Sequence, residues 1–233
     1  MVLRQLFDPD SSTFTYLVGD AGEAAVIDPV RERVDEVLAV LDAERLALRW
    51  ILETHVHADH VTGGGLLRER TGARLAIHHL ANACACSDRS LADGDEVRVG
   101  AVTLRVLETP GHTPESVSYV VDGRMVTTGD ALLIGTCGRT DFQHGDPGAL
   151  WDAIHARLFT LPDDVIVYPG HDYKGQTSST IGRERAGNAR LSGRTRDEFI
   201  ALMSHLNLPP PRRISEALPA NERCGEGGIP HAS

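Results

Sequence analysis

The segment from residue 54 to residue 60, Thr-His-Val-His-Ala-Asp-His, places three histidines and one aspartate within six positions. It directly follows residues 49–53 (RWILE), an apolar stretch that predicts a short buried strand. Imidazole and carboxylate groups are the ligands that zinc, ferrous iron and manganese prefer in proteins. The segment therefore predicts a metal site at the end of a strand.

Three later segments repeat this arrangement of an apolar strand, a break of at most four residues, and a metal-capable side chain. They lead to His112, Asp130 and His171, each directly preceded by a glycine. A single histidine near a strand end is more often a hydrogen-bonding residue than a ligand. Because loops at one edge of a sheet converge, the recurrence favours one shared metal site.

The order of the predicted elements indicates two sheets rather than one. Strands are expected at 13–18, 24–27, 49–53, 74–77, 96–99, 102–108, 116–121, 124–128 and 165–168, and helices at 31–45, 66–70, 147–159, 180–190 and 195–206, before a proline cluster at 209–211 and an irregular tail. Strands first alternate with helices, then follow one another, then alternate again. This order favours an α+β fold in which two sheets lie between helices.

Length and charge limit the classes of function. The chain has 233 residues, of which 41% are hydrophobic and 24% charged, and this composition excludes a disordered chain. Its net charge of −10 argues against nucleic acid and membrane surfaces as partners, because like charges repel. Residues 1–14 lack an apolar signal core and the Arg-rich pattern of a transit peptide. We expect a cytoplasmic protein with a single domain over residues 1–233, whose short helical C-terminal extension begins at about residue 180.

The four cysteines are too few for a disulfide framework in a chain of this length. Cys84 and Cys86 form a C-A-C pair without the C-x-x-C spacing of redox or zinc sites, and Cys137 and Cys224 are isolated. We therefore expect reduced thiols and assign them no role.

Four motifs resemble the signature of the metallo-β-lactamase superfamily, in order and spacing. They are THVHADH at 54–60, PGHT at 110–113, GD at 129–130 and PGH at 169–171. The resemblance covers about residues 10–175 and implies an αββα sandwich of two mixed β-sheets flanked by helices, with the metal site at one edge. The superfamily contains hydrolases, nucleases and redox enzymes, so the fold does not settle the function.

Segments outside these motifs are similar to persulfide dioxygenases, also called sulfur dioxygenases. They are CGRTDFQ at 137–143, YPGHDYKG at 168–175, NARL at 188–191, residues 199–208 and PANERCG at 219–225. One departure is Ala189, where that family usually has proline, and we expect it to affect only a local turn. This resemblance implies an iron-dependent enzyme of sulfide detoxification that oxidises glutathione persulfide with dioxygen to sulfite and glutathione.

The same resemblance implies the roles of the metal-capable residues. One ferrous iron per chain would be held by His55, His112 and Asp130, through which these residues would be catalytic. The remaining members of the motifs would surround the iron and orient its ligands by hydrogen bonds: His57, Asp59, His60 and His171. In two-metal hydrolases of the superfamily, these residues also bind metal.

The substrate's two carboxylates require positive contacts on an acidic chain. Arg139 is the first candidate because its planar guanidinium matches a carboxylate, and Tyr173 and Lys174 come next. The alternative for Arg139 is an ordinary salt bridge with Asp141 or Asp146.

Two other functions remain open at this point. A thioester hydrolase like glyoxalase II would use two metals to activate a bridging hydroxide, but that family usually has a longer and more basic helical extension. A non-catalytic metal sensor would need no open coordination positions. The family resemblance also makes a homodimer and a sulfurtransferase of the same pathway expected partners.

Overall fold

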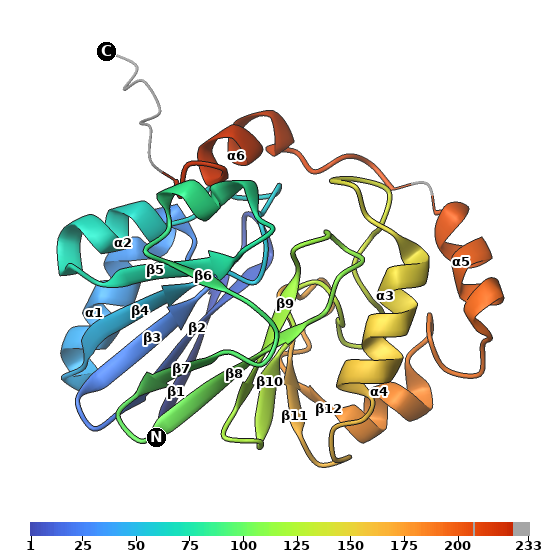
Figure 1. Ribbon diagram of the computed structural model, residues 1–233, viewed down its shortest axis with the longest axis horizontal. Helices are drawn as coiled ribbons and strands as arrows, with labels where there is room; N and C mark the ends of the chain where they lie inside the picture. Colours follow the sequence, from blue (N-terminus) through green and yellow to red (C-terminus); the bar gives the residue numbers. More distant parts are fainter. Residues whose placement is uncertain (207, 226–233) are drawn as a thin grey trace.

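Two six-stranded β-sheets form the centre of the computed structural model, which describes residues 1–206 and 208–225 (Figure 1). The first sheet runs β1 (Val2–Asp8), β2 (Thr13–Asp20), β3 (Glu23–Ile27), β4 (Ala47–Leu52), β5 (Arg74–His78) and β6 (Arg89–Leu91). The second runs β12 (Ser179–Thr180), β11 (Ile166–Tyr168), β10 (Met125–Thr127), β9 (Val117–Val121), β8 (Val102–Glu108) and β7 (Glu96–Val99). Each sheet contains parallel and antiparallel pairs, so both are mixed.

Helices cover the outer sides of the sheets (Figure 1). They are α1 (Val34–Glu44), α2 (Gly64–Thr71) and α6 (Ile214–Asn221) with the first sheet, and α3 (Pro147–Ala153), α4 (Ile181–Gly187) and α5 (Arg196–Ser204) with the second. Short turns complete the structure: η1 (Arg31–Arg33), η2 (Asn82–Cys86) and the π-helical η3 (Ile154–Leu158). This arrangement confirms the predicted αββα sandwich.

The central strands β2, β3 and β9 are buried on both faces, which explains their nearly continuous apolar sequence. In β2, Tyr16 and Val18 face the cluster between the sheets, whereas Leu17 faces the cluster under α1 and α2. In β4, Leu52 and Ile51 divide in the same way. Successive residues of these strands therefore point alternately into the apolar layer between the sheets and into the layer under the helices.

Backbone hydrogen bonds join the loops after β4, β10 and β11 to one another or to neighbouring strands at one edge of the sandwich. Val117 N donates to Thr54 O across 2.9 Å and links the loop after β4 to the second sheet. Gly170 N donates to Gly129 O, and Phe14 N donates to Gly170 O, each across 2.8 Å. The predicted convergence of these loops is thus present in the fold.

The structure contains five elements that the sequence patterns do not predict: β1, η2, β6, β12 and α6. The expectation of an irregular tail after Pro211 is wrong, because α6 follows it. Pro219 lies inside this short helix and suggests a break, but contacts with distant loops stabilise the helix. Among the described helices, none is long and apolar enough to cross a bilayer.

The expectation that all four cysteines are reduced is also wrong. Cys86 and Cys224 form a disulfide across a sequence separation of 138 residues, with Cα atoms 6.1 Å apart. Cys137 is a buried free thiol. The fold brings η2 against the segment that follows α6, and no local spacing in the sequence indicates this proximity.

Candidate metal centre

His55, His112 and Asp130 come from three different loops and meet at the convergent edge. One ligand atom from each lies within 4.8 Å of the other two. The imidazole rings of His55 and His112 are perpendicular, with centroids 4.8 Å apart, and His112 Nε2 lies 3.5 Å from Asp130 Oδ2. The structure therefore brings together the three residues that the sequence predicts as ligands.

A hydrogen bond fixes which nitrogen of His112 carries the proton. Its Nδ1 lies 2.7 Å from the carbonyl oxygen of Arg139. A carbonyl oxygen only accepts, so Nδ1–H is the donor and Nε2 keeps its lone pair toward Asp130.

Two consecutive hydrogen bonds orient His55 in a similar way. Thr54 Oγ1 donates to Asp28 Oδ2 across 2.9 Å, so it accepts from His55 Nδ1, also 2.9 Å away. The backbone N–H of Thr54 donates to the other oxygen of Asp28. His55 Nε2 is thereby left unprotonated, as a metal ligand requires.

The electrostatics favour the protonation states that bind metal. Burial, together with the neighbouring His57, holds the pKa of His55 well below its ordinary value. Burial would raise the pKa of Asp130, but His171 and His112 outweigh it and hold that pKa well below its usual range. A neutral imidazole and an ionised carboxylate are the forms that coordinate a cation.

Asp59, His60 and His171 form a hydrogen-bonded group beside this set. Asp59 Oδ2 faces His60 Nδ1 and His171 Nε2 at 3.0 Å each, and accepts from Thr13 Oγ1 at 2.9 Å. His171 Nδ1 lies 2.6 Å from Asp130 Oδ1. Burial lowers the pKa of His171, but the two carboxylates outweigh burial and raise this pKa well above its ordinary value. Both ring nitrogens of His171 are therefore occupied as donors.

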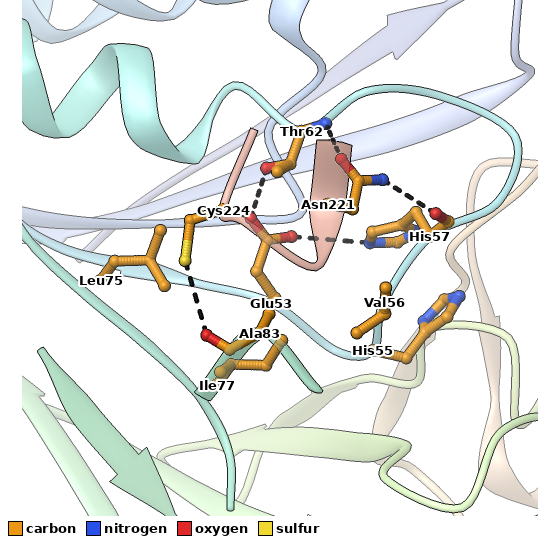
Figure 2. A pocket seen from close by; sticks show the side chains of 10 residues that line it. All are labelled: Glu53, His55, Val56, His57, Thr62, Leu75, Ile77, Ala83, Asn221 and Cys224. Carbon is orange, nitrogen blue, oxygen red and sulfur yellow. Dashed lines mark hydrogen bonds and ion pairs between the residues drawn. The ribbon is translucent and has the colours of Figure 1, made fainter. Parts of the chain in front are cut away.

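His57 lies beside the proposed ligand His55 and contacts two buried acidic residues, of which Figure 2 shows Glu53. Its Nε2 is 3.1 Å from Asp28 Oδ1 and 3.6 Å from Glu53 Oε2. Burial lowers the pKa of His57, but Asp28 outweighs this effect and the result is a pKa of about 9. Burial raises the pKa of Glu53 to about 8. His57 is thus positioned as a cation beside Asp28, whereas Glu53 keeps its proton at neutral pH.

Asn221 connects the C-terminal helix to the metal-binding loop, and the sequence patterns do not single it out. Its Nδ2 donates to the carbonyl oxygens of His57 and His60, and its Oδ1 accepts from Thr62 N, each across 2.8 Å. Figure 2 shows the bonds to His57 and Thr62. The only sequence signal is its position inside the PANERCG segment. Asp28 and Glu53 were likewise missed, although each is an acidic residue directly after a strand.

The three expected substrate contacts lie near this site: Tyr173 and Lys174 beside His171, and Arg139 through the carbonyl that accepts from His112. Arg139 makes a bidentate salt bridge to Asp141 at 2.7 and 2.8 Å, and its Nη1 donates to Pro209 O at 2.6 Å. Tyr173, 68% exposed, stacks parallel on His171 with ring centroids 5.7 Å apart. Tyr173, Lys174 and His171 line one pocket. Arg139 thus forms one of the salt bridges considered as its alternative role.

Comparison with protein families places the motifs in a known group. The model of the metallo-beta-lactamase superfamily matches residues 8–83 and 87–171. The human mitochondrial persulfide dioxygenase ETHE1 is 47% identical over 229 residues, covering 97% of this chain and 89% of the human protein.

Solved structures agree with this placement. The crystal structure of ETHE1 from Myxococcus xanthus superposes with a TM-score of 0.94 at 50% identity, covering 97% of this chain and 100% of that chain. TTHA1623, solved in a di-iron-bound form, has a TM-score of 0.68 at 29% identity and covers 82% of this chain and 100% of that chain. The latter shows that this fold holds two iron ions in some relatives.

Proposed function

Because the chain belongs to the metallo-beta-lactamase superfamily, we propose that it acts within it as a persulfide dioxygenase with one ferrous iron per chain. The enzyme is an oxidoreductase, as its 47% identity to a curated persulfide dioxygenase over nearly the whole chain supports. The main support for the iron site is the proximity of His55, His112 and Asp130, whose ligand atoms lie within 4.8 Å of one another.

The reaction consumes glutathione persulfide, dioxygen and water and yields glutathione, sulfite and two protons. Four electrons pass from the terminal sulfur to dioxygen, which a redox-inert ion such as zinc cannot mediate. When bound by two histidines and one carboxylate, ferrous iron supplies a redox-active centre with positions left for other ligands. Thr54 and the Arg139 carbonyl hold the two imidazoles in the tautomers that this binding requires.

The hydrogen bonds of Asp59 and His171 favour one metal over two, although ligand atoms of His57, Asp59 and His60 also lie within 4.8 Å of one another. Asp59 Oδ2 already faces three donors, and His171 already uses both ring nitrogens. A second metal would have to replace the hydrogen bonds of Asp59 Oδ2 and displace a proton from His171 Nε2, whereas His60 Nε2 has no hydrogen-bond partner among the described residues. Their role in our proposal is to orient Asp130 and the loop that carries His57.

Substrate binding is assigned to Arg139, Tyr173 and Lys174. Glutathione carries two carboxylates, and Tyr173 and Lys174 line one pocket together with His171. Arg139 offers a guanidinium beside the same site, but Asp141 competes for it. A glutathione carboxylate would have to use the remaining N–H of Arg139 or displace Asp141.

Metal replacement tests the function. Protein reconstituted anaerobically with ferrous iron should consume oxygen when glutathione persulfide is added, in an oxygen-electrode assay. The zinc-loaded protein should fold equally well and consume none. Equal oxygen uptake by both forms would contradict a redox role of the metal.

The hydrolase alternative has its own substrate and can be measured in parallel. A glyoxalase II-like enzyme would cleave S-lactoylglutathione with two metals per chain. We expect the iron form to leave this thioester essentially intact. Thioester hydrolysis without oxygen uptake would contradict the dioxygenase proposal and identify the protein as a hydrolase.

The proposal extends to organisation and location. We propose a single domain with a helical extension from about residue 180, assembly as a homodimer, a sulfurtransferase as pathway partner, and a cytoplasmic location. The human relative is named mitochondrial, so fractionation of the native cell decides the location.

A further inference from the structure

The Cys86–Cys224 disulfide lies directly behind the metal-binding loop. Cys224 is buried and lines the same pocket as His55 and His57, as Figure 2 shows. Cys86 lies at the end of η2 and is partly exposed. A small thiol can therefore reach the disulfide from the Cys86 side, whereas Cys224 faces the interior.

This disulfide is the covalent link next to Asn221, which lies three residues before Cys224. Asn221 holds residues 57–62 through its hydrogen bonds to His57, His60 and Thr62. The side chain is buried, so losing its position would leave two carbonyls and one N–H of the loop without partners.

The rest of the segment is held mainly by a few hydrogen bonds. Gly65 N donates to Cys224 O at 2.8 Å, and Arg31 Nη1 donates to Gly225 O at 2.6 Å. Within α6, Ala217 and Asn221 are the buried residues, Leu218 packs partly buried against the cluster under α1 and α2, and Arg213 just before the helix pairs with Glu32. With so little apolar burial, the docking of this helix depends strongly on the covalent link.

We propose that Cys86–Cys224 is a thiol–disulfide exchange site for low-molecular-weight thiols of the glutathione type, and that its redox state controls how firmly Asn221 holds residues 57–62. A thiolate attacks Cys86 Sγ, the protein disulfide breaks, and Cys224 leaves as a thiolate. A second thiol resolves the mixed disulfide at Cys86. In total, two small thiols are oxidised to one small disulfide, and the two electrons that they lose reduce the protein disulfide to two thiols. The small disulfide reverses the reaction.

Reduction removes a constraint on a loop of more than a hundred residues and leaves α6 attached by non-covalent contacts alone. The amides of α6 and of residues 57–62 then open more often. Because this loop carries His57, Asp59 and His60 next to the ligand His55, a looser loop also releases metal faster. The inference does not depend on which reaction the metal centre performs.

Hydrogen exchange of the full-length, metal-loaded protein tests this inference in glutathione buffers of graded thiol-to-disulfide ratio. Intact mass after alkylation should report two thiols gained on reduction. Exchange in residues 57–62 and 214–224 should accelerate about tenfold, with faster loss of metal to a chelator. Cys86→Ser and Cys224→Ser should exchange like the reduced protein in every buffer, whereas Cys137→Ser and Cys84→Ser should respond like the wild type.

Asn221→Ala separates the hydrogen bonds from the disulfide. This variant should keep the disulfide while residues 57–62 exchange as fast as in the reduced wild type. Identical exchange in the oxidised, reduced and Cys86→Ser proteins would overturn the inference. A pair of free thiols in the most oxidising buffer, or a response lost in Cys84→Ser, would overturn it equally.

Discussion

His171 Nδ1 lies 2.6 Å from Asp130 Oδ1, and this contact assigns the two oxygens of the aspartate different tasks. Oδ1 accepts from His171, whereas Oδ2 faces His112 Nε2 at 3.5 Å. Asp130 can therefore offer one oxygen to a metal beside His112 while the other stays hydrogen-bonded. His171 supports the ligand set by orienting it.

This relationship predicts two classes of variant. His112→Ala and Asp130→Ala should lose the iron, because each removes one of three protein ligands. His60→Ala and His171→Ala should keep it, with activity reduced about 10–100-fold through lost orientation. Metal analysis of the four proteins, each purified and reconstituted identically with ferrous iron, makes the comparison.

Circular dichroism of the same samples is the control that each variant is folded. Two metals per wild-type chain, with one lost in His60→Ala, would contradict the single-iron proposal. The dinuclear arrangement of the hydrolases would then describe this site.

Thr54 and Thr127 provide a matched pair of threonine-to-valine substitutions. Thr54→Val removes the acceptor for His55 Nδ1 and a donor to Asp28, so metal affinity should fall about 10–100-fold. Thr127 Oγ1 is buried without a hydrogen-bond partner among the described residues. Thr127→Val should therefore leave metal affinity unchanged and raise stability by about 1 kcal/mol.

Competition with a metal chelator and urea denaturation measure the two effects. Equal metal affinity in the two variants would show that Thr54 does not orient His55. A less stable Thr127→Val protein would show that this hydroxyl has a partner that the structure does not record.

Arg139→Ala tests whether the guanidinium serves the substrate or the loop. If it binds a glutathione carboxylate, its loss should weaken substrate affinity about tenfold to a hundredfold, with the iron content unchanged. Asp141→Asn frees the guanidinium and should leave affinity equal or higher. Steady-state KM values and melting temperatures of both variants are the measurements. Normal affinity in Arg139→Ala, with equal destabilisation of both proteins, would assign Arg139 to its salt bridge alone.

The sequence predicts those parts of the fold that depend on local patterns. Residues 96–99 and 102–108 are predicted with the bounds of β7 and β8, because Val97, Val99, Val102 and Leu104 mark the buried face with a period of two. The repeated pattern of a metal-capable residue after a strand likewise predicts that His55, His112 and Asp130 meet at one edge of the sheets.

The remaining features depend on which distant segments the fold brings together. Nothing within eight residues of Asn221 indicates that its amide will bind the carbonyls of His57 and His60. The pairing of Cys86 with Cys224 follows from the same docking of α6. Arg139 is the opposite case, a contact that the sequence does indicate, because its partner Asp141 is also its nearest charged neighbour in the sequence.

The buried charge of His57 predicts how the stability of the metal-free protein depends on pH. Asp28 raises the pKa of His57 from 6.5 to about 9 against the effect of burial. The folded protein therefore binds this proton more tightly than the unfolded chain, so the stabilisation is complete below pH 6.5 and is lost as the pH rises toward 9. Urea denaturation should show a loss on the order of 2 kcal/mol across this range. His57→Gln should remove the part of this dependence that His57 supplies and leave the part due to Glu53 and His171, whose pKa values are also raised. His205→Gln, a change on the exposed end of α5, should keep the whole dependence. An unchanged slope in His57→Gln would mean that His57 is neutral in the folded protein.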